Sequence, residues 1–192
     1  MILLAAAVVG VLVGWMRGGR WQALADVPFR WGGWALAALA AQLLVVRAVG
    51  PEGQGLRWAV MAAAYTLLLA VAWRNCRLPG VWMVGLGLLL NGAVILANGG
   101  AMPITPEMAQ QIGVPADVVG RVAGALAAGA KDIILPQEQT ALWILSDILR
   151  LPLGGRVAFS VGDVWLALGV VRLVERSMSG RLPSRRAEAP AN

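Results

Sequence analysis

The chain has 192 residues, of which 59% are hydrophobic and 14% charged, and none is histidine. Its mean hydropathy is +0.72, and its charged fraction is well below the roughly one quarter typical of soluble proteins, so the composition excludes an ordinary soluble enzyme and predicts a membrane protein. The formal charge is +6, but the basic residues flank apolar runs, where orientation signals are expected, so we predict no nucleic-acid partner.

Five apolar runs favour one helical bundle rather than a string of domains. We expect spans at residues 2–16, 32–46, 58–73, 81–97 and 159–174, each slightly shorter than the roughly 20 residues that a spanning helix needs. The predicted fold is therefore an all-α integral membrane protein, a five-helix transmembrane bundle in a single domain over residues 1–176. Residues 177–192 are predicted to form a basic, disordered cytoplasmic tail.

The basic residues predict the direction of each crossing. Nine lie in three short segments that the five runs place on one side of the membrane, and six are spread over the two connections on the other side. The positive-inside rule then places the N-terminus outside and the C-terminus inside. The inner set comprises Arg17, Arg20, Arg30, Arg74, Arg77, Arg176, Arg181, Arg185 and Arg186, and the outer set comprises Arg47, Arg57, Arg121, Lys131, Arg150 and Arg156.

Six of the nine tryptophans fall near the expected inner ends of the first four runs. Indole rings favour the headgroup level of a bilayer, so these residues predict an interfacial belt with an anchoring role. They are Trp15, Trp21, Trp31, Trp34, Trp73 and Trp82.

Small residues at a spacing of four indicate close helix contacts in the first two runs. Gly10 and Gly14 form a GxxxG pattern, and Ala37 with Ala41 repeats the spacing. The pattern is compatible both with packing inside the bundle and with dimerisation.

The segment 98–158, expected outside, carries helix signals rather than the composition of a linker. Thr105 followed by Pro106 and Glu107 predicts a short helix over Pro106–Ile112. A second start at Pro115 leads into an apolar stretch, Val118–Ala130, which is too short to span and could lie in the interface, re-enter the membrane or cover the bundle. An amphipathic third helix is expected over Pro136–Leu149.

Two asparagines in and after the fourth run could carry function. Asn91 and Asn98 are seven residues apart, which puts them on one helix face. They either line a polar track or ligand pocket with the Gly99-Gly100 backbone, or play structural roles, with Asn91 bonding a neighbouring helix and Asn98-Gly99-Gly100 capping the helix end.

The fifth run opens with Ser160-Val161-Gly162-Asp163. A carboxylate at this depth implies a partner, a polar cavity or the handling of a cation or proton. The pattern also resembles a capping box, in which an acid in the first turn is favoured by the helix dipole. The two roles can coexist.

Catalytic patterns are mostly missing from the sequence. With no histidine and one cysteine, Cys76, there is no Cys/His metal cluster, His-based triad or CxxC pair, and we predict neither a metal nor a cofactor nor any catalytic residue. Asp163 and Asp147 could act as a general acid and base, but nothing in their spacing requires it. Whether the chain is an enzyme therefore stays open, with the balance against it.

The chain resembles a family of uncharacterised bacterial membrane proteins, a domain of unknown function with two motifs. The first, Asn-Gly-Gly-x-Met-Pro, is matched by Asn98, Gly99, Gly100, Met102 and Pro103, and the second, Ser-x-Gly-Asp, by Ser160, Gly162 and Asp163, with Leu145, Asp147 and Ile148 resembling a block between them. The resemblance implies a multi-pass protein of the bacterial inner (plasma) membrane and brings no established activity. Histidine, expected in the long segment of the family, is absent here.

Three functions follow as hypotheses. The first is a protein that binds or passes a small polar or lipid-like ligand at an outward-facing site formed by Asn91, Asn98, Gly99, Gly100, Met102, Pro103, Asp147, Ser160 and Asp163. The second is an accessory or assembly subunit of a larger membrane complex, and the third a carboxylate-dependent membrane enzyme acting on a lipid. The expected partners are the lipid bilayer, such a ligand, and a membrane protein partner or a second copy of the chain.

Overall fold

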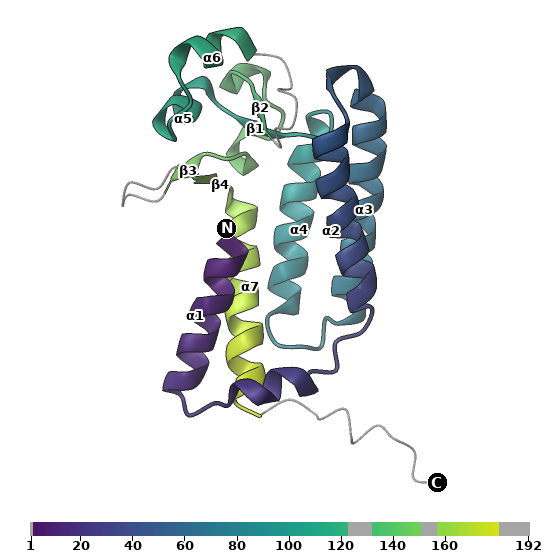
Figure 1. Cartoon of the computed structure of the whole chain (residues 1–192), viewed down its shortest axis with the longest axis vertical. Coiled ribbons are helices and arrows are strands. Elements are labelled where there is room, and N and C mark those ends of the chain that lie inside the picture. The colour runs from purple at the N-terminus through teal and green to yellow at the C-terminus, as the bar shows by residue number, and fades with distance from the viewer. Residues whose placement is uncertain (1, 123–131, 151–156, 181–192) are drawn as a thin grey trace.

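Five long helices form the body of the protein in a computed structural model that describes residues 2–122, 132–150 and 157–180 (Figure 1). Each helix contacts the next in the order α1, α7, α4, α3, α2. The first and last helices of the chain are therefore neighbours, as Figure 1 shows for α1 and α7. The helices are α1 (Ile2–Met16), α2 (Gly32–Ala48), α3 (Gln54–Arg74), α4 (Val81–Ala97) and α7 (Val161–Met178).

The helix bounds follow the apolar runs closely. α1 and α4 have the predicted bounds, and α2 and α3 extend theirs by a few residues. α7 begins two residues later than expected and continues to Met178, so its last turn includes the start of the expected tail, whose residues 181–192 lie outside the described part. Within that part, α3 alone is long and apolar enough to cross a membrane by length and composition, while α1, α2 and α4 are apolar but shorter.

Glycines set the closest approaches between helices. Gly10 and Gly14 are buried against α7, where an added Cβ would lie 2.8 Å from Val174 Cβ and 2.7 Å from Met178 Sδ. The GxxxG pattern is therefore used for packing inside the chain. The expected Ala37 contact inside the bundle is wrong, because Ala37 is exposed and its neighbour Ala38 packs against Ala64 and Leu68 of α3. A contact through Ala37 between two copies of the chain stays a prediction.

The described residues between Asn98 and Ser160 form a small structure at one end of the bundle, here called the cap (upper part of Figure 1). Two short sheets in it correct the prediction of an all-α fold: β1 (Met102–Ile104) pairs in parallel with β2 (Asp132–Ile134), and β3 (Leu149–Arg150) pairs antiparallel with β4 (Ala158–Phe159). The hydrophobic core of the cap is separate from the bundle and consists of Ile104, Ala109, Val119, Ile134 and Ala158.

The first two predicted cap helices are present. α5 (Pro106–Gln111) starts as expected, with the Thr105 side chain accepting a hydrogen bond from Met108 N at 3.2 Å, and it is followed by Gly113 at a φ of +99°. α6 (Ala116–Val122) also begins where expected. The predicted continuation to Ala130 falls on residues 123–131, outside the described residues.

The third predicted helix, Pro136–Leu149, is wrong. The segment instead forms two single 3-10 turns, Gln137–Gln139 and Trp143–Leu145, and then enters β3. Leu142 has a φ of +55°, and both backbone groups of Ala141 bond to the Asn98 side chain. Contacts with a distant residue therefore replace the helical hydrogen bonds that the amphipathic pattern predicts.

The opposite end of the bundle is called the tryptophan end, because the six belt tryptophans lie there and are exposed, from 50% for Trp31 to 81% for Trp73. A linker with a 3-10 helix (Trp21–Asp26) joins α1 to α2 at this end. Asn75, the C-cap of α3, fastens that linker: its Oδ1 accepts from Arg30 N and its Nδ2 donates to Arg30 O, both at 2.8 Å. One more short 3-10 helix, Pro51–Gly53, leads into α3 at the cap end of the bundle.

Candidate functional site

A hydrogen-bonded network joins the middle of α4 to the start of α7. Asn91 Nδ2 donates to Asp163 Oδ1 at 2.9 Å, and Ser160 Oγ donates to Asn91 Oδ1 at 2.8 Å. Asn91 is 5% exposed and Ser160 is fully buried. The interpretation that Asn91 bonds a neighbouring helix is therefore confirmed, and it brings together three of the predicted site residues.

The same two residues of α7 form the predicted capping box. Ser160 Oγ accepts from Asp163 N at 3.0 Å, and Asp163 Oδ2 accepts from Ser160 N at 3.2 Å. Each group thus satisfies a backbone donor that a helix start leaves unpaired. Both Asp163 oxygens are engaged, one with the helix start and one with Asn91.

Two glycines allow this close crossing of α4 and α7. A Cβ at Gly162 would overlap Asn91 Oδ1, and one at Gly87 would lie 2.7 Å from Leu166 Cγ. The polar network therefore lies where the two backbones approach most tightly, and its geometry depends on glycine at position 162.

Asp163 is the accessible member of the network. Its side chain is partly exposed, its hydrogen-bond donors are the neutral Asn91 amide and a backbone N–H, and no described basic residue forms an ion pair with it. Asp163 lies in the first turn of α7, where an acidic side chain is favoured. The arrangement places a carboxyl group at the cap end of the bundle.

Asn98 has a different partner, although it lies on the same face of α4 as Asn91. Its Nδ2 donates to Val94 O at 2.7 Å and to Ala141 O at 2.9 Å, and its Oδ1 accepts from Ala141 N at 3.0 Å. Gly99 and Gly100 follow with φ values of +74° and +87° and end the helix. The capping interpretation of Asn98-Gly99-Gly100 is confirmed, and the hydrogen bonds of the two asparagines lead to separate elements.

A second buried polar centre surrounds Arg57 in the first turns of α3. The residue is fully buried, its Nε donates to Gly100 O at 3.1 Å, and Asp132 of β2 acts electrostatically on its charge. Gly100 is held against α3, where an added Cβ would lie 3.0 Å from Trp58 Cα. Arg57 therefore connects the bundle to the cap.

Sequence reasoning missed this role of Arg57, which was counted only as a loop charge preceding the third run. The available signal was its position one residue before Trp58 with no break in the helical pattern, because a charge on an apolar helix needs a partner. Asp132 gave no such signal, since its contact arises only when β2 pairs with β1.

The remaining predicted residues are part of the cap's framework. Met102 and Pro103 are buried in β1, and Asp147, 1% exposed, donates its backbone N–H to Pro103 O at 3.2 Å. Gly99 lies against the Gln54 side chain. Residues 2–122, 132–150 and 157–180 contain no group of three or more acidic, cysteine or histidine residues that could hold a metal ion.

One family matches residues 26–175 of the chain, and it is described as a family of unknown function (DUF5317). The matched range contains both polar centres and leaves α1 outside. No curated protein and no solved structure matches the chain significantly.

Proposed function

The chain belongs to the DUF5317 family, and we propose that it is a multi-pass bacterial inner-membrane protein that binds a small polar or lipid-like ligand at the cap end of its helix bundle. The family is of unknown function, so the proposed ligand binding rests on the geometry of the Asp163 site alone.

The membrane placement is supported by the surface of the bundle. Large apolar side chains are exposed along α1 and α2, among them Leu4, Leu36 and Leu44 at 66% or more. A soluble monomer rarely exposes apolar side chains on this scale. The exposed tryptophans gather at one end together with most of the basic residues of the short connections, as expected at the cytoplasmic interface.

The sole cysteine provides a direct test of this placement. Cys76 is exposed in the connection between α3 and α4 at the tryptophan end. We expect a membrane-impermeant maleimide to label it only after the cells are permeabilised. In a Cys76→Ser background, a cysteine at the exposed position Glu107 of α5 should react in intact cells. The reverse pattern would contradict the proposed orientation.

The partly exposed Asp163 carboxylate is the observation that carries the ligand site. It lies between α4 and the cap, and Asn91, Ser160 and the start of α7 hold it in place. An ion that is fixed by neutral donors at an accessible position can bind a cationic or hydrogen-bond-donating group without first breaking an ion pair. Asn91 orients the carboxylate through its side-chain amide.

Native mass spectrometry of the protein released gently from its own membrane tests the site. We expect the wild type to carry an additional small-molecule mass and Asp163→Asn to lose it. Asp117→Asn is the matched control, because Asp117 is an exposed carboxylate of α6 that pairs with Arg121. A folded Asp163→Asn variant that keeps every additional mass of the wild type would overturn the site.

Thr105→Ala separates a loss of binding from a loss of stability. It removes the hydroxyl that caps α5, and it leaves Asp163, Ser160 and Asn91 unchanged. Loss of a helix cap costs about 1 kcal/mol, so thermal stability should fall while the additional mass is retained. Loss of the mass in this variant as well would assign the effect of Asp163→Asn to the fold.

The same spectra address the other two hypotheses. A co-purifying protein would favour an accessory subunit, although the Gly10 and Gly14 face is already used by α7 and offers no helix-docking surface. The enzyme hypothesis requires Asp147 to reach a substrate, and that residue is buried within the cap.

A further inference from the structure

A cavity at the tryptophan end, far from Asp163 along α7, has a volume of about 520 Å³. Its walls come from three segments that are distant in sequence: α1, the linker that follows it, and the last turn of α7. The lining includes Val11, Trp15, Arg20, Trp21, Gln22 and Met178.

Backbone contacts fix the shape of this cavity. Gly19 N donates to Gly14 O, and Arg20 N donates to Met178 O, both at 2.9 Å. A Cβ at Gly19 would lie 2.9 Å from Met178 Cβ, so the linker runs directly against α7. Arg20 therefore leaves the bundle at a defined position rather than from a freely moving loop.

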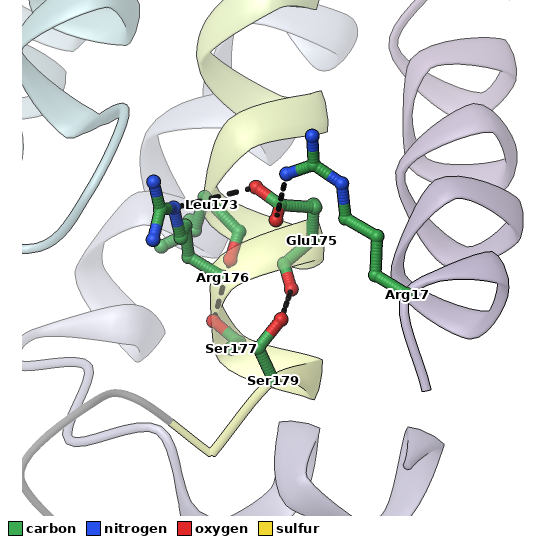
Figure 2. Close-up of polar contacts among 6 residues, drawn as sticks. All are labelled: Arg17, Leu173, Glu175, Arg176, Ser177 and Ser179. Atoms are coloured by element: carbon green, nitrogen blue, oxygen red, sulfur yellow. Dashed lines mark hydrogen bonds and ion pairs between the residues drawn. The ribbon is translucent and has the colours of Figure 1, made fainter. Parts of the chain in front are cut away.

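Glu175 and its two neighbouring arginines are paired, whereas Arg20 has no partner among the described residues. Figure 2 shows Glu175 between two arginines: Arg17 Nη1 lies 2.8 Å from Oε1, and Arg176 Nε lies 3.5 Å from Oε2. The Glu175 side chain is 6% exposed, and both of its carboxylate oxygens face an arginine. The Arg20 side chain makes no hydrogen bond or ion pair with any residue that the structure describes.

We propose that this cavity binds an anionic phospholipid of the cytoplasmic leaflet, with the phosphate on the Arg20 guanidinium. Arginine is well suited to a phosphate group because its planar fork can bind two oxygens. Trp15 and Trp21 lie at the level where indoles meet lipid headgroups, and the apolar wall at Val11 offers a path for an acyl chain along α1. The inference rests on the membrane placement proposed above but not on the Asp163 site.

Lipid retention tests the proposal. The full-length protein is reconstituted in nanodiscs that contain equal amounts of phosphatidylglycerol and phosphatidylcholine, and the lipids that remain bound after transfer to mild detergent are measured by native mass spectrometry. We expect the wild type to retain phosphatidylglycerol preferentially, and Arg20→Gln to lower that preference about fivefold, the effect of one basic residue at an anionic membrane surface.

Arg77→Gln is the matched control, since Arg77 is exposed at the same end of the bundle but does not line the cavity. Its phosphatidylglycerol preference should equal that of the wild type. Equal losses in both variants, or no loss in Arg20→Gln, would overturn the site in favour of general surface charge or of no site at all.

Two further measurements distinguish a phospholipid site from a site for free phosphate and from the Asp163 site. Displacement of the lipid by millimolar inorganic phosphate would indicate a site for free phosphate and overturn the lipid assignment. Asp163→Asn should retain phosphatidylglycerol as the wild type does, so the cap-end site can fail while this one stands. Labelling of Cys76 in intact cells would put the cavity in the other leaflet and overturn both the placement and this proposal.

Discussion

Asparagine side chains fasten the connecting segments at both ends of the bundle with the same geometry. Asn75 ends α3 and Asn98 ends α4; each donates to the carbonyl four residues earlier and binds both backbone groups of one distant residue. At the tryptophan end Asn75 is buried and holds Arg30, in the linker before α2. At the cap end Asn98 is half-buried and holds Ala141.

The consequences of the two clamps differ. Arg30 lies in a connection that the sequence already marks as a loop, so Asn75 fixes its position without changing its predicted structure. Ala141 lies within a segment whose apolar spacing predicts a helix, and there the clamp accompanies two 3-10 turns in place of that helix. A single side chain from a distant element can therefore outweigh a local pattern where the local preference is weak.

Loss of Arg57 should have the largest effect, because the cap then loses its buried connection to α3. Removing one member of a buried, charge-paired contact costs about 3–5 kcal/mol, so we expect Arg57→Met to lower the thermal unfolding temperature in detergent most strongly. Arg47→Met removes an exposed arginine at the end of α2 and should change the stability by less than about 0.5 kcal/mol.

Arg57→Lys keeps the prediction testable if Arg57→Met fails to fold. It preserves a positive charge opposite Asp132 but lacks the planar guanidinium whose Nε bonds Gly100 O. Stability between that of the wild type and that of Arg57→Met is expected. A wild-type unfolding temperature in Arg57→Met would contradict the role of Arg57 in holding the cap.

Asn75→Ala should have the next largest effect. The substitution removes three side-chain hydrogen bonds made by the buried Asn75 side chain, two of them to the Arg30 backbone. The net contribution of one such hydrogen bond is about 0.5–1.5 kcal/mol. Hydrogen exchange followed by mass spectrometry should show faster exchange in the linker between α1 and α2, with the cap unchanged.

Asn98→Ala should have the smallest effect on global stability, because this clamp is half-exposed and Arg57 still holds the cap. We expect a loss of about 1 kcal/mol and faster exchange over residues 137–146, with the bundle unchanged. Gln139→Ala, at an exposed position in the same segment, is the control and should exchange as the wild type does. Equal acceleration in the bundle and the cap would contradict a local role for Asn98.

Much of the bundle was predictable from sequence because each helix is a continuous apolar run. The bounds of α1 and α4, the capping box at Ser160 and the start of α5 all follow from signals within a few residues of one another. Asn91 and Asp163 could be named as candidates from their polarity within apolar runs, but their hydrogen bond could not, because it depends on how α4 and α7 cross.

The cap was predicted less well because its structure depends on pairings between distant residues. β1 and β2 are three residues each, and their paired residues are 30 positions apart in sequence. No alternation of side chains over so short a length distinguishes a strand. The Arg57 centre needs that sheet to bring Asp132 near α3. Contacts of this kind depend on which distant elements pair with one another. The periodic spacing of apolar residues along a helix or strand does not contain that information.

The helix order also constrains how a newly made chain reaches this structure. α1 is synthesised first, yet its helix partner is α7, and the Arg17–Glu175 bond spans 158 positions of sequence. The Gly10 and Gly14 face of the nascent α1 therefore has no packing partner while α2, α3 and α4 are made and pair with one another. Release of α7 from the ribosome then covers α1 and brings Asp163 to Asn91, so the last step of assembly also completes the candidate site.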